Sequence, residues 1–201
     1  MTSPHPGKFH LIHPPPPNSF GEALYKSFLE AIYVLFKQGY GVSGLKLLLS
    51  ALDTMAFLTT GNDNAGSDFK KWLDKYVDLN AVGIDSDELW EHRNALLHMT
   101  RFHSKAVHKG KVKFLVPSYR EAPQEYKDRL KSEMDALYGT NYKFYSTVKL
   151  FNAVADGINK FVAEVKTDSV LRATVKSNFG EIIPDIPIGV TRTREPNLPL
   201  E

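Results

Sequence analysis

Residues 87 to 98 predict an amphipathic helix that carries an arginine on its apolar side. At about 100° per residue on an α-helix, one apolar arc is formed by Leu89, Trp90, Leu96, Leu97 and Met99. Arg93 projects from near the middle of that arc, and Asn94 and His98 share a stripe at its border. Because an arginine is almost never buried without a polar partner, this pattern predicts a polar cleft between helices, with Trp90 and Leu97 in the core.

Helical spacing of apolar residues recurs along most of the chain. Together with serine and glycine at the ends of the segments, it predicts helices at about residues 19–38, 43–59, 86–102 and 142–166, and shorter ones at 68–76, 124–137 and 170–176. Apolar and polar residues alternate between 107 and 119, which is typical of a short strand or hairpin. The expected fold is all-α, a bundle of four to five main helices with room for a short β-hairpin insertion.

The chain of 201 residues fits one domain with appendages. We expect a proline-rich extended leader over 1–18, the helical domain over 19–178, and an extended C-terminal tail over 179–201. The formal net charge is only +2, so no global basic field indicates nucleic acid. A basic cluster follows the arginine-bearing helix, and we interpret it first as a solvated loop and second as a local patch; it comprises Lys105, His108, Lys109, Lys111 and Lys113.

Several classes of protein are disfavoured by composition. The chain has no cysteine, which excludes disulfides and thiolate metal sites. The spacing of His92, His98, His103 and His108 gives no recognisable ligand set, so we expect neither a metal nor another cofactor. No secretory signal pattern opens the chain and no apolar run approaches the roughly 20 residues that span a bilayer. We therefore expect a cytoplasmic protein without a membrane segment.

Residues 93 to 98 read R-N-x-x-x-H, which resembles the signature of the HEPN superfamily, the higher eukaryote and prokaryote nucleotide-binding domains. The resemblance covers about residues 19 to 102, with a closing helix at 142–166. It implies a small all-α bundle that is usually a homodimer and, in many members, a metal-independent endoribonuclease. Other members are non-catalytic modules that bind nucleotides or proteins. A setting in stress or phage defence, and a regulatory partner protein, are likewise implied only by the resemblance.

One subgroup of the superfamily fits less well. HEPN toxins that are paired with a nucleotidyltransferase antitoxin tend to carry a tyrosine two residues after the motif histidine. This chain has Thr100 there. Control by modification of that tyrosine is therefore not expected.

The candidate catalytic residues are Arg93, Asn94 and His98. RNA can be cleaved without metal when its own 2′-hydroxyl attacks the adjacent phosphorus. Imidazole exchanges protons near neutral pH, which suits His98 for proton transfer. The guanidinium of Arg93 suits the developing phosphorane charge, and Asn94 could orient either the histidine or the phosphate.

A structural interpretation of the same residues stays open. Arg93 could pair with Asp53 on the second helix, and His98 could simply end its own helix. Helical geometry places Arg93 and His98 about 140° apart. They would converge only if the arginine wraps around the helix or a second subunit supplies the opposing pair. Glu88 and Glu91 are expected on the solvated side.

Overall fold

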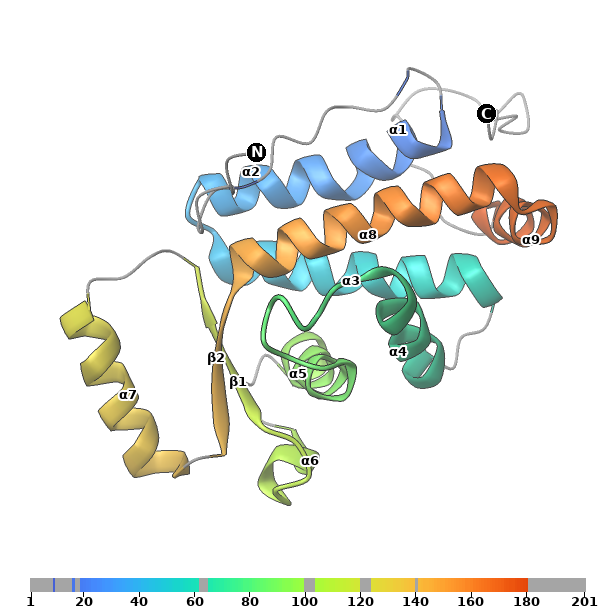
Figure 1. The fold of residues 1–201 in the computed structure, drawn as a ribbon. Coiled ribbons are helices and arrows are strands. Elements are labelled where there is room, and N and C mark those ends of the chain that lie inside the picture. Colours follow the sequence, from blue (N-terminus) through green and yellow to red (C-terminus); the bar gives the residue numbers. More distant parts are fainter. Residues whose placement is uncertain are drawn as a thin grey trace.

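The computed structural model describes residues 9, 16, 19–61, 65–99, 104–119, 124–139 and 141–180. The predicted leader and tail lie outside the described residues except at Phe9, Pro16, Phe179 and Gly180. The elements follow the chain in the order α1 Phe20–Leu24, π-helical turn η1 Tyr25–Glu30, α2 Ala31–Lys37, α3 Gly41–Thr60, α4 Ala65–Tyr76, α5 Ser86–Met99, α6 Lys105–His108, β1 Phe114–Ser118, α7 Gln124–Tyr138, β2 Tyr142–Ser146, α8 Thr147–Thr167 and α9 Ser169–Phe179. The predicted all-α bundle is confirmed (Figure 1).

Helix α3 lies at the centre of the bundle, between α2 and α8 on one side and α4 and α5 on the other (Figure 1). Its inward-facing apolar side chains are almost fully buried, among them Leu45, Leu48, Leu49, Leu52 and Met55. By length and apolar character it is the one described helix that could also cross a bilayer. Here those side chains pack against other helices, so α3 is the core helix onto which the candidate site is built.

Helix α8 closes the bundle with an aromatic face. Phe151 packs edge-on against Phe36 and Phe9, and Phe161 does the same against Trp72. Gly157 lets α8 approach the end of α4, because a Cβ at this position would lie 2.9 Å from Val77 Cγ2 and 3.1 Å from the Tyr76 carbonyl oxygen.

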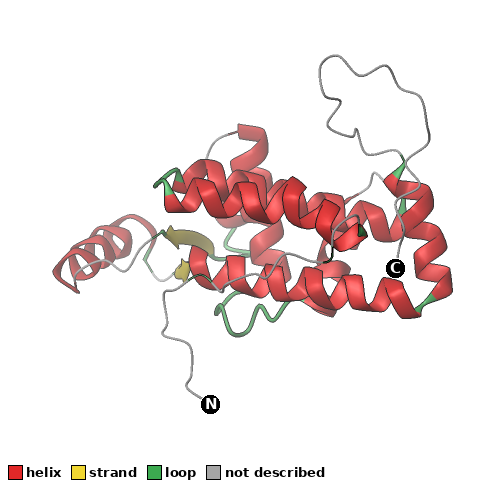
Figure 2. Ribbon diagram, turned by 90° about the horizontal axis from the view of Figure 1, so that it is seen from above, coloured by secondary structure: helices red, strands yellow, loops and turns green. Residues whose placement is uncertain are grey.

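The predicted insertion is present, but its strands do not form a hairpin. β1 and β2 pair in parallel, with Phe114 opposite Tyr142 and Ser118 opposite Ser146. Parallel strands need a crossover, and α7 supplies it. Figure 2 shows this helix standing off from the bundle beyond the two strands. A small second core lies between α6, β1 and α7, formed by Val107, Phe114 and Met134.

Candidate active site

Helix α5 begins with a reciprocal pair of hydrogen bonds. The Glu88 backbone N–H donates to Asp85 Oδ1 at 2.8 Å, and the Asp85 N–H donates to Glu88 Oε2 at 3.1 Å. This is a capping box with Asp85 as the capping residue. Glu88 also accepts from Lys143 Nζ of β2 at 2.8 Å and is buried, so its expected place on the solvated side was wrong. The Asp85 N–H and the Lys143 ammonium both donate to this carboxylate and offset the cost of burying its charge.

The buried face of α5 is rotated relative to the predicted arc. It consists of Glu88, Leu89, His92, Ala95 and Leu96. Trp90 and Leu97 are only partly buried and pack against the edge of the core. The difference arises because polar side chains occupy core positions: His92 is 3 % exposed, and its Nε2 shares a hydrogen bond of 3.2 Å with the Tyr145 hydroxyl. Arg93 therefore lies at the border of the buried face rather than at its middle.

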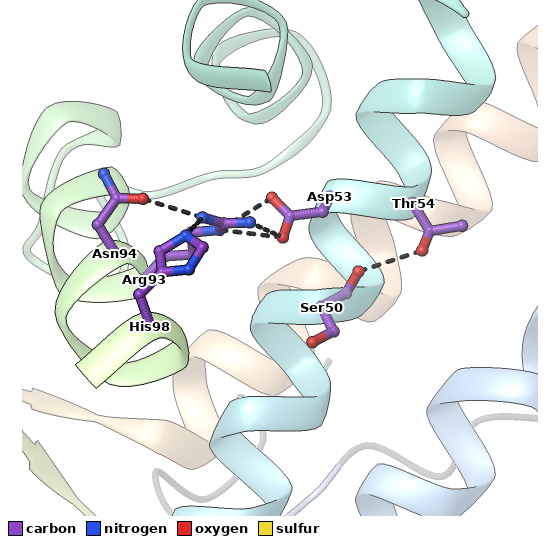
Figure 3. Close-up of polar contacts among 6 residues, drawn as sticks. All are labelled: Ser50, Asp53, Thr54, Arg93, Asn94 and His98. Atoms are coloured by element: carbon purple, nitrogen blue, oxygen red, sulfur yellow. Dashed lines mark hydrogen bonds and ion pairs between the residues drawn. The ribbon is translucent and has the colours of Figure 1, made fainter. Parts of the chain in front are cut away.

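Arg93 reaches across to α3 and forms a two-point contact with Asp53. Its Nε donates to Asp53 Oδ2 at 2.9 Å and Nη2 donates to the same oxygen at 2.6 Å, while Nε is also 3.1 Å from Oδ1 (Figure 3). The side chains are 14 % and 22 % exposed, so the pair is sheltered but open on one side. The pairing with Asp53 that the sequence left as an alternative is therefore present.

The third nitrogen of the guanidinium faces the other two motif residues. Arg93 Nη1 donates to Asn94 Oδ1 at 2.9 Å and lies 2.8 Å from His98 Nε2 (Figure 3). A guanidinium has only donors, so His98 Nε2 accepts in this contact and the ring proton sits on Nδ1. The three predicted residues thus meet within one chain, because the long arginine side chain spans the angle that separates Arg93 from His98.

Trp90 supports the guanidinium from one side. The centre of the Arg93 guanidinium lies 5.1 Å from the Trp90 ring centroid, a cation–π distance. Trp90 in turn packs on Phe69 at 5.3 Å, and Gly66 of α4 allows this because a Cβ there would come within 3.1 Å of the ring. Sequence reasoning assigned Trp90 to the core and missed this role, although its position three residues before Arg93 on a helix predicts contact.

Burial sets the electrostatics around the site. It raises the pKa of Asp53, and the hydrogen bonds and positive charge of Arg93 act in the opposite direction without offsetting it fully. Burial also lowers the pKa of His92 to about 4. His92 is thus neutral at physiological pH and belongs to the core contact with Tyr145 rather than to the Arg93 group.

Within the described part of the chain, no three histidine, aspartate or glutamate side chains lie close enough together to hold a metal ion. His103 lies outside the described residues. Comparison with protein-family models, with curated proteins and with solved structures found no match to this chain. The function is therefore argued from the geometry of the Arg93 group.

Proposed function

We propose that this protein is a metal-independent endoribonuclease of HEPN type, with Arg93, Asn94 and His98 as its catalytic residues. The observation that carries the proposal is the 2.8 Å contact between Arg93 Nη1 and His98 Nε2, with Asn94 on the same nitrogen. It places a permanent positive charge beside an unprotonated imidazole nitrogen. His98 is exposed, so RNA can reach the group from solvent.

The donors of Arg93 indicate how a phosphate would enter. Of the five N–H groups of a guanidinium, Asp53 takes one on Nε and one on Nη2, and Asn94 and His98 take those on Nη1. Among the described residues, one N–H on Nη2 is left for a phosphate oxygen. A second phosphate oxygen reaches Nη1 by displacing either Asn94 or His98. In the proposed reaction it displaces His98, which frees the Nε2 lone pair to act as a general base.

The reaction then needs no cation. His98 Nε2 takes the proton of the 2′-hydroxyl, and the 2′-oxygen attacks the adjacent phosphorus. The P–O5′ bond breaks, a 2′,3′-cyclic phosphate forms, and the 5′-oxygen takes a proton from solvent. Arg93, held in place by Asp53 and Trp90, stabilises the extra negative charge on the phosphorane oxygens.

The second candidate function is a non-catalytic module that binds a nucleotide or a protein. The two-point Asp53–Arg93 contact favours it, because it satisfies much of the guanidinium without any ligand. In such a module the motif would be a structural link between α3 and α5. Cleavage assays separate the two functions.

The test is cleavage of a single-stranded RNA in EDTA. We expect products that end in 2′,3′-cyclic phosphate, and no cleavage of an otherwise bound substrate that has hydrogen in place of the 2′-hydroxyl. His98→Ala should lower the rate by about 100-fold or more, and Arg93→Ala should be comparably damaging. Arg129→Ala on the exposed face of α7 is the control and should cleave like the wild type.

Arg93→Lys separates catalysis from folding. The lysine keeps a positive charge near Asp53 but lacks the planar fork that meets Asp53 and phosphate together. The Arg93→Lys variant should therefore remain folded, as a circular dichroism melt would show, but lose most of the cleavage rate. Undiminished cleavage by both the His98 and Arg93 variants would assign the activity to a contaminant or to another site, and the binding module would become the first choice.

A further inference from the structure

The segment that follows the motif helix holds four lysines in one compact turn. Helix α6 is capped by Ser104, whose Oγ accepts from the N–H groups of residues 106 and 107. Backbone hydrogen bonds from Gly110 to Val107 and from Lys111 to Ala106 then close the turn before β1. The lysine turn, as we name it, comprises Lys105, Lys109, Lys111 and Lys113, all of them exposed.

The lysine turn is not neutralised. The sequence has no aspartate or glutamate between Glu91 and Glu121. None of its four lysines pairs with a carboxylate in the part of the protein that the structure describes. Lysines elsewhere do, among them Lys26, Lys70, Lys71, Lys75, Lys131 and Lys143. The near-neutral chain therefore carries a local excess of positive charge here, which would attract a polyanion.

The turn is also tied to the candidate active site. Ser104, the cap of α6, follows His98 by six positions, so their Cα atoms lie within about 22 Å even at full extension of the chain. Figure 1 shows α6 at the outer end of β1, on the same side of the bundle as α5. A single polyanion can therefore extend from the Arg93 group to the lysine turn.

We propose that the lysine turn binds the sugar–phosphate backbone of an RNA whose reacting phosphate lies at Arg93 and His98; this inference rests on the proposed function. Val107 within the turn and Phe114 directly after it are buried in the second core, and Val112 is partly buried against it. The turn thus offers no fully exposed large apolar side chain to insert into a lipid bilayer, as a membrane-binding surface would. Lysine binds phosphate as a point charge, so the interaction adds affinity without reading the base sequence.

The experiment measures binding of a 2′-O-methyl RNA, which cannot be cleaved, by fluorescence anisotropy over a series of salt concentrations. The test variant replaces Lys105, Lys109 and Lys111 with alanine. The control variant replaces Lys149, Lys166 and Lys176, three exposed lysines of α8 and α9, with alanine and so has the same net charge as the test variant.

We expect the test variant to bind the RNA at least 10-fold more weakly than the wild type does. Affinity decreases with salt, and the steepness of log affinity against log salt should be smaller in the test variant by up to about 2. Each phosphate that a lysine no longer binds reduces this steepness by about 0.7. The control should change far less.

Failure of this inference can be told apart from failure of the proposed function. If the test and control variants bind RNA equally, or the wild type does not bind it, the lysine turn is not an RNA surface, even where wild-type cleavage depends on His98. If the test variant alone binds weakly but no variant cleaves RNA, the RNA surface stands and the nuclease proposal falls. A second assay measures binding of the same proteins to phosphatidylserine vesicles. If the test variant binds these vesicles more weakly than the wild type but binds RNA equally well, the inference is overturned and the turn is a membrane surface.

Discussion

A single arginine side chain links two helices and the proposed chemistry. Arg93 is held by Asp53 of α3, by Asn94 and His98 of its own helix, and by the ring of Trp90. Substitution of any one member of this group is expected to lower the stability of the fold, because it leaves another buried polar group without a hydrogen bond. The two sequence interpretations, a structural ion pair and a catalytic arginine, are therefore compatible rather than exclusive.

The Arg93–Asp53 pair should be energetically coupled. Asp53→Ala and Arg93→Ala should each lower the free energy of unfolding by about 1–3 kcal/mol, because each leaves a partly buried charge without its partner. The double variant should cost less than the two single variants combined, with a coupling of about 0.5–3 kcal/mol. Urea unfolding of the four proteins measures this. The pair Lys26–Glu22, whose lysine is exposed, is the control and should show much weaker coupling. Equal coupling in the two pairs would mean that the Arg93–Asp53 pair stabilises the fold no more than a surface ion pair does.

Burial of His92 should make the fold sensitive to acid. The unfolded imidazole titrates near pH 6.5, whereas the pKa in the folded protein is about 4. Between these values the unfolded chain binds more protons, so the free energy of unfolding falls as the pH is lowered, by up to about 3 kcal/mol in total. Above pH 6.5 both states are neutral at this position and the effect is absent.

Urea unfolding at pH 7.5 and pH 4.5 measures that dependence. His92→Gln removes the titrating group and keeps a partner for the Tyr145 hydroxyl, so the difference between the two pH values should shrink relative to the wild type. His108→Gln, at the exposed end of α6 and outside the Arg93 group, should keep the wild-type difference. An equal difference in the wild type and His92→Gln would contradict the assignment.

At the scale of elements, the sequence predicted the helices well because helical periodicity is a local signal. The predicted 19–38, 43–59 and 86–102 correspond to the continuous helix from Phe20 to Lys37, to α3 Gly41–Thr60 and to α5 Ser86–Met99. The prediction failed where long-range pairing decides the structure. Residues 142–146 were assigned to the last helix, yet they pair with β1 across the whole of α7, and no local pattern specifies such a partner.

The rotation of α5 has a related cause. Hydrophobicity alone put Trp90 and Leu97 in the core, because the pattern could not foresee that Glu88 would be held by Lys143 and His92 by Tyr145. The three candidate residues were nevertheless singled out from the sequence alone, and their catalytic role stays a proposal. Their motif is local, and the structure brings the three of them together.

The packing of α8 on α4 should depend on Gly157. A helical Gly→Ala change gains about 1 kcal/mol of helix propensity where space allows. Here the new Cβ would press on Val77 and on the Tyr76 backbone, which cannot move aside as a flexible side chain can. We expect Gly157→Ala to destabilise the protein by about 1–3 kcal/mol, the usual cost of overpacking. Asn159→Ala, exposed on the same helix, is the control and should be neutral or slightly stabilising in thermal melts. A stabilised Gly157→Ala would show that the two helices have room to separate.

At the scale of the whole molecule, the bundle leaves one side of α5 available to a second copy. Asp87 and His98 are exposed, and Glu91 and Asn94 between them are only partly buried. The four positions fall on one stripe of the helix beside its buried face, and Asp87 at the start of the stripe pairs with Lys70 of α4. We propose a symmetric dimer with α5 at or near its two-fold axis, which would bring two Arg93–His98 pairs into one cleft.

Sedimentation velocity measures the predicted assembly. A dimer at tens of micromolar, well above the dissociation constants of specific dimers, is the expected result. Glu91→Arg changes the charge at the middle of the stripe without entering the core, and it should shift the protein towards monomer while the melting temperature of the fold changes little. A wild-type protein that remains monomeric at that concentration would count against the dimer.

The dimer also allows a test of which chain supplies each catalytic residue. Arg93 Nη1 and His98 Nε2 lie 2.8 Å apart within one chain, so each chain holds a complete pair of its own. A heterodimer of Arg93→Ala with His98→Ala contains one intact arginine and one intact histidine, but on different chains. We therefore expect co-refolded mixtures of these two variants to be as inactive on RNA as either variant alone.

A mixture of wild type with His98→Ala should, by contrast, retain cleavage from the intact chains. Recovery of a sizeable fraction of the wild-type rate in the first mixture would mean that the functional pair is formed across the two-fold axis. The intrachain pair would then be an arrangement of the resting protein that substrate binding replaces.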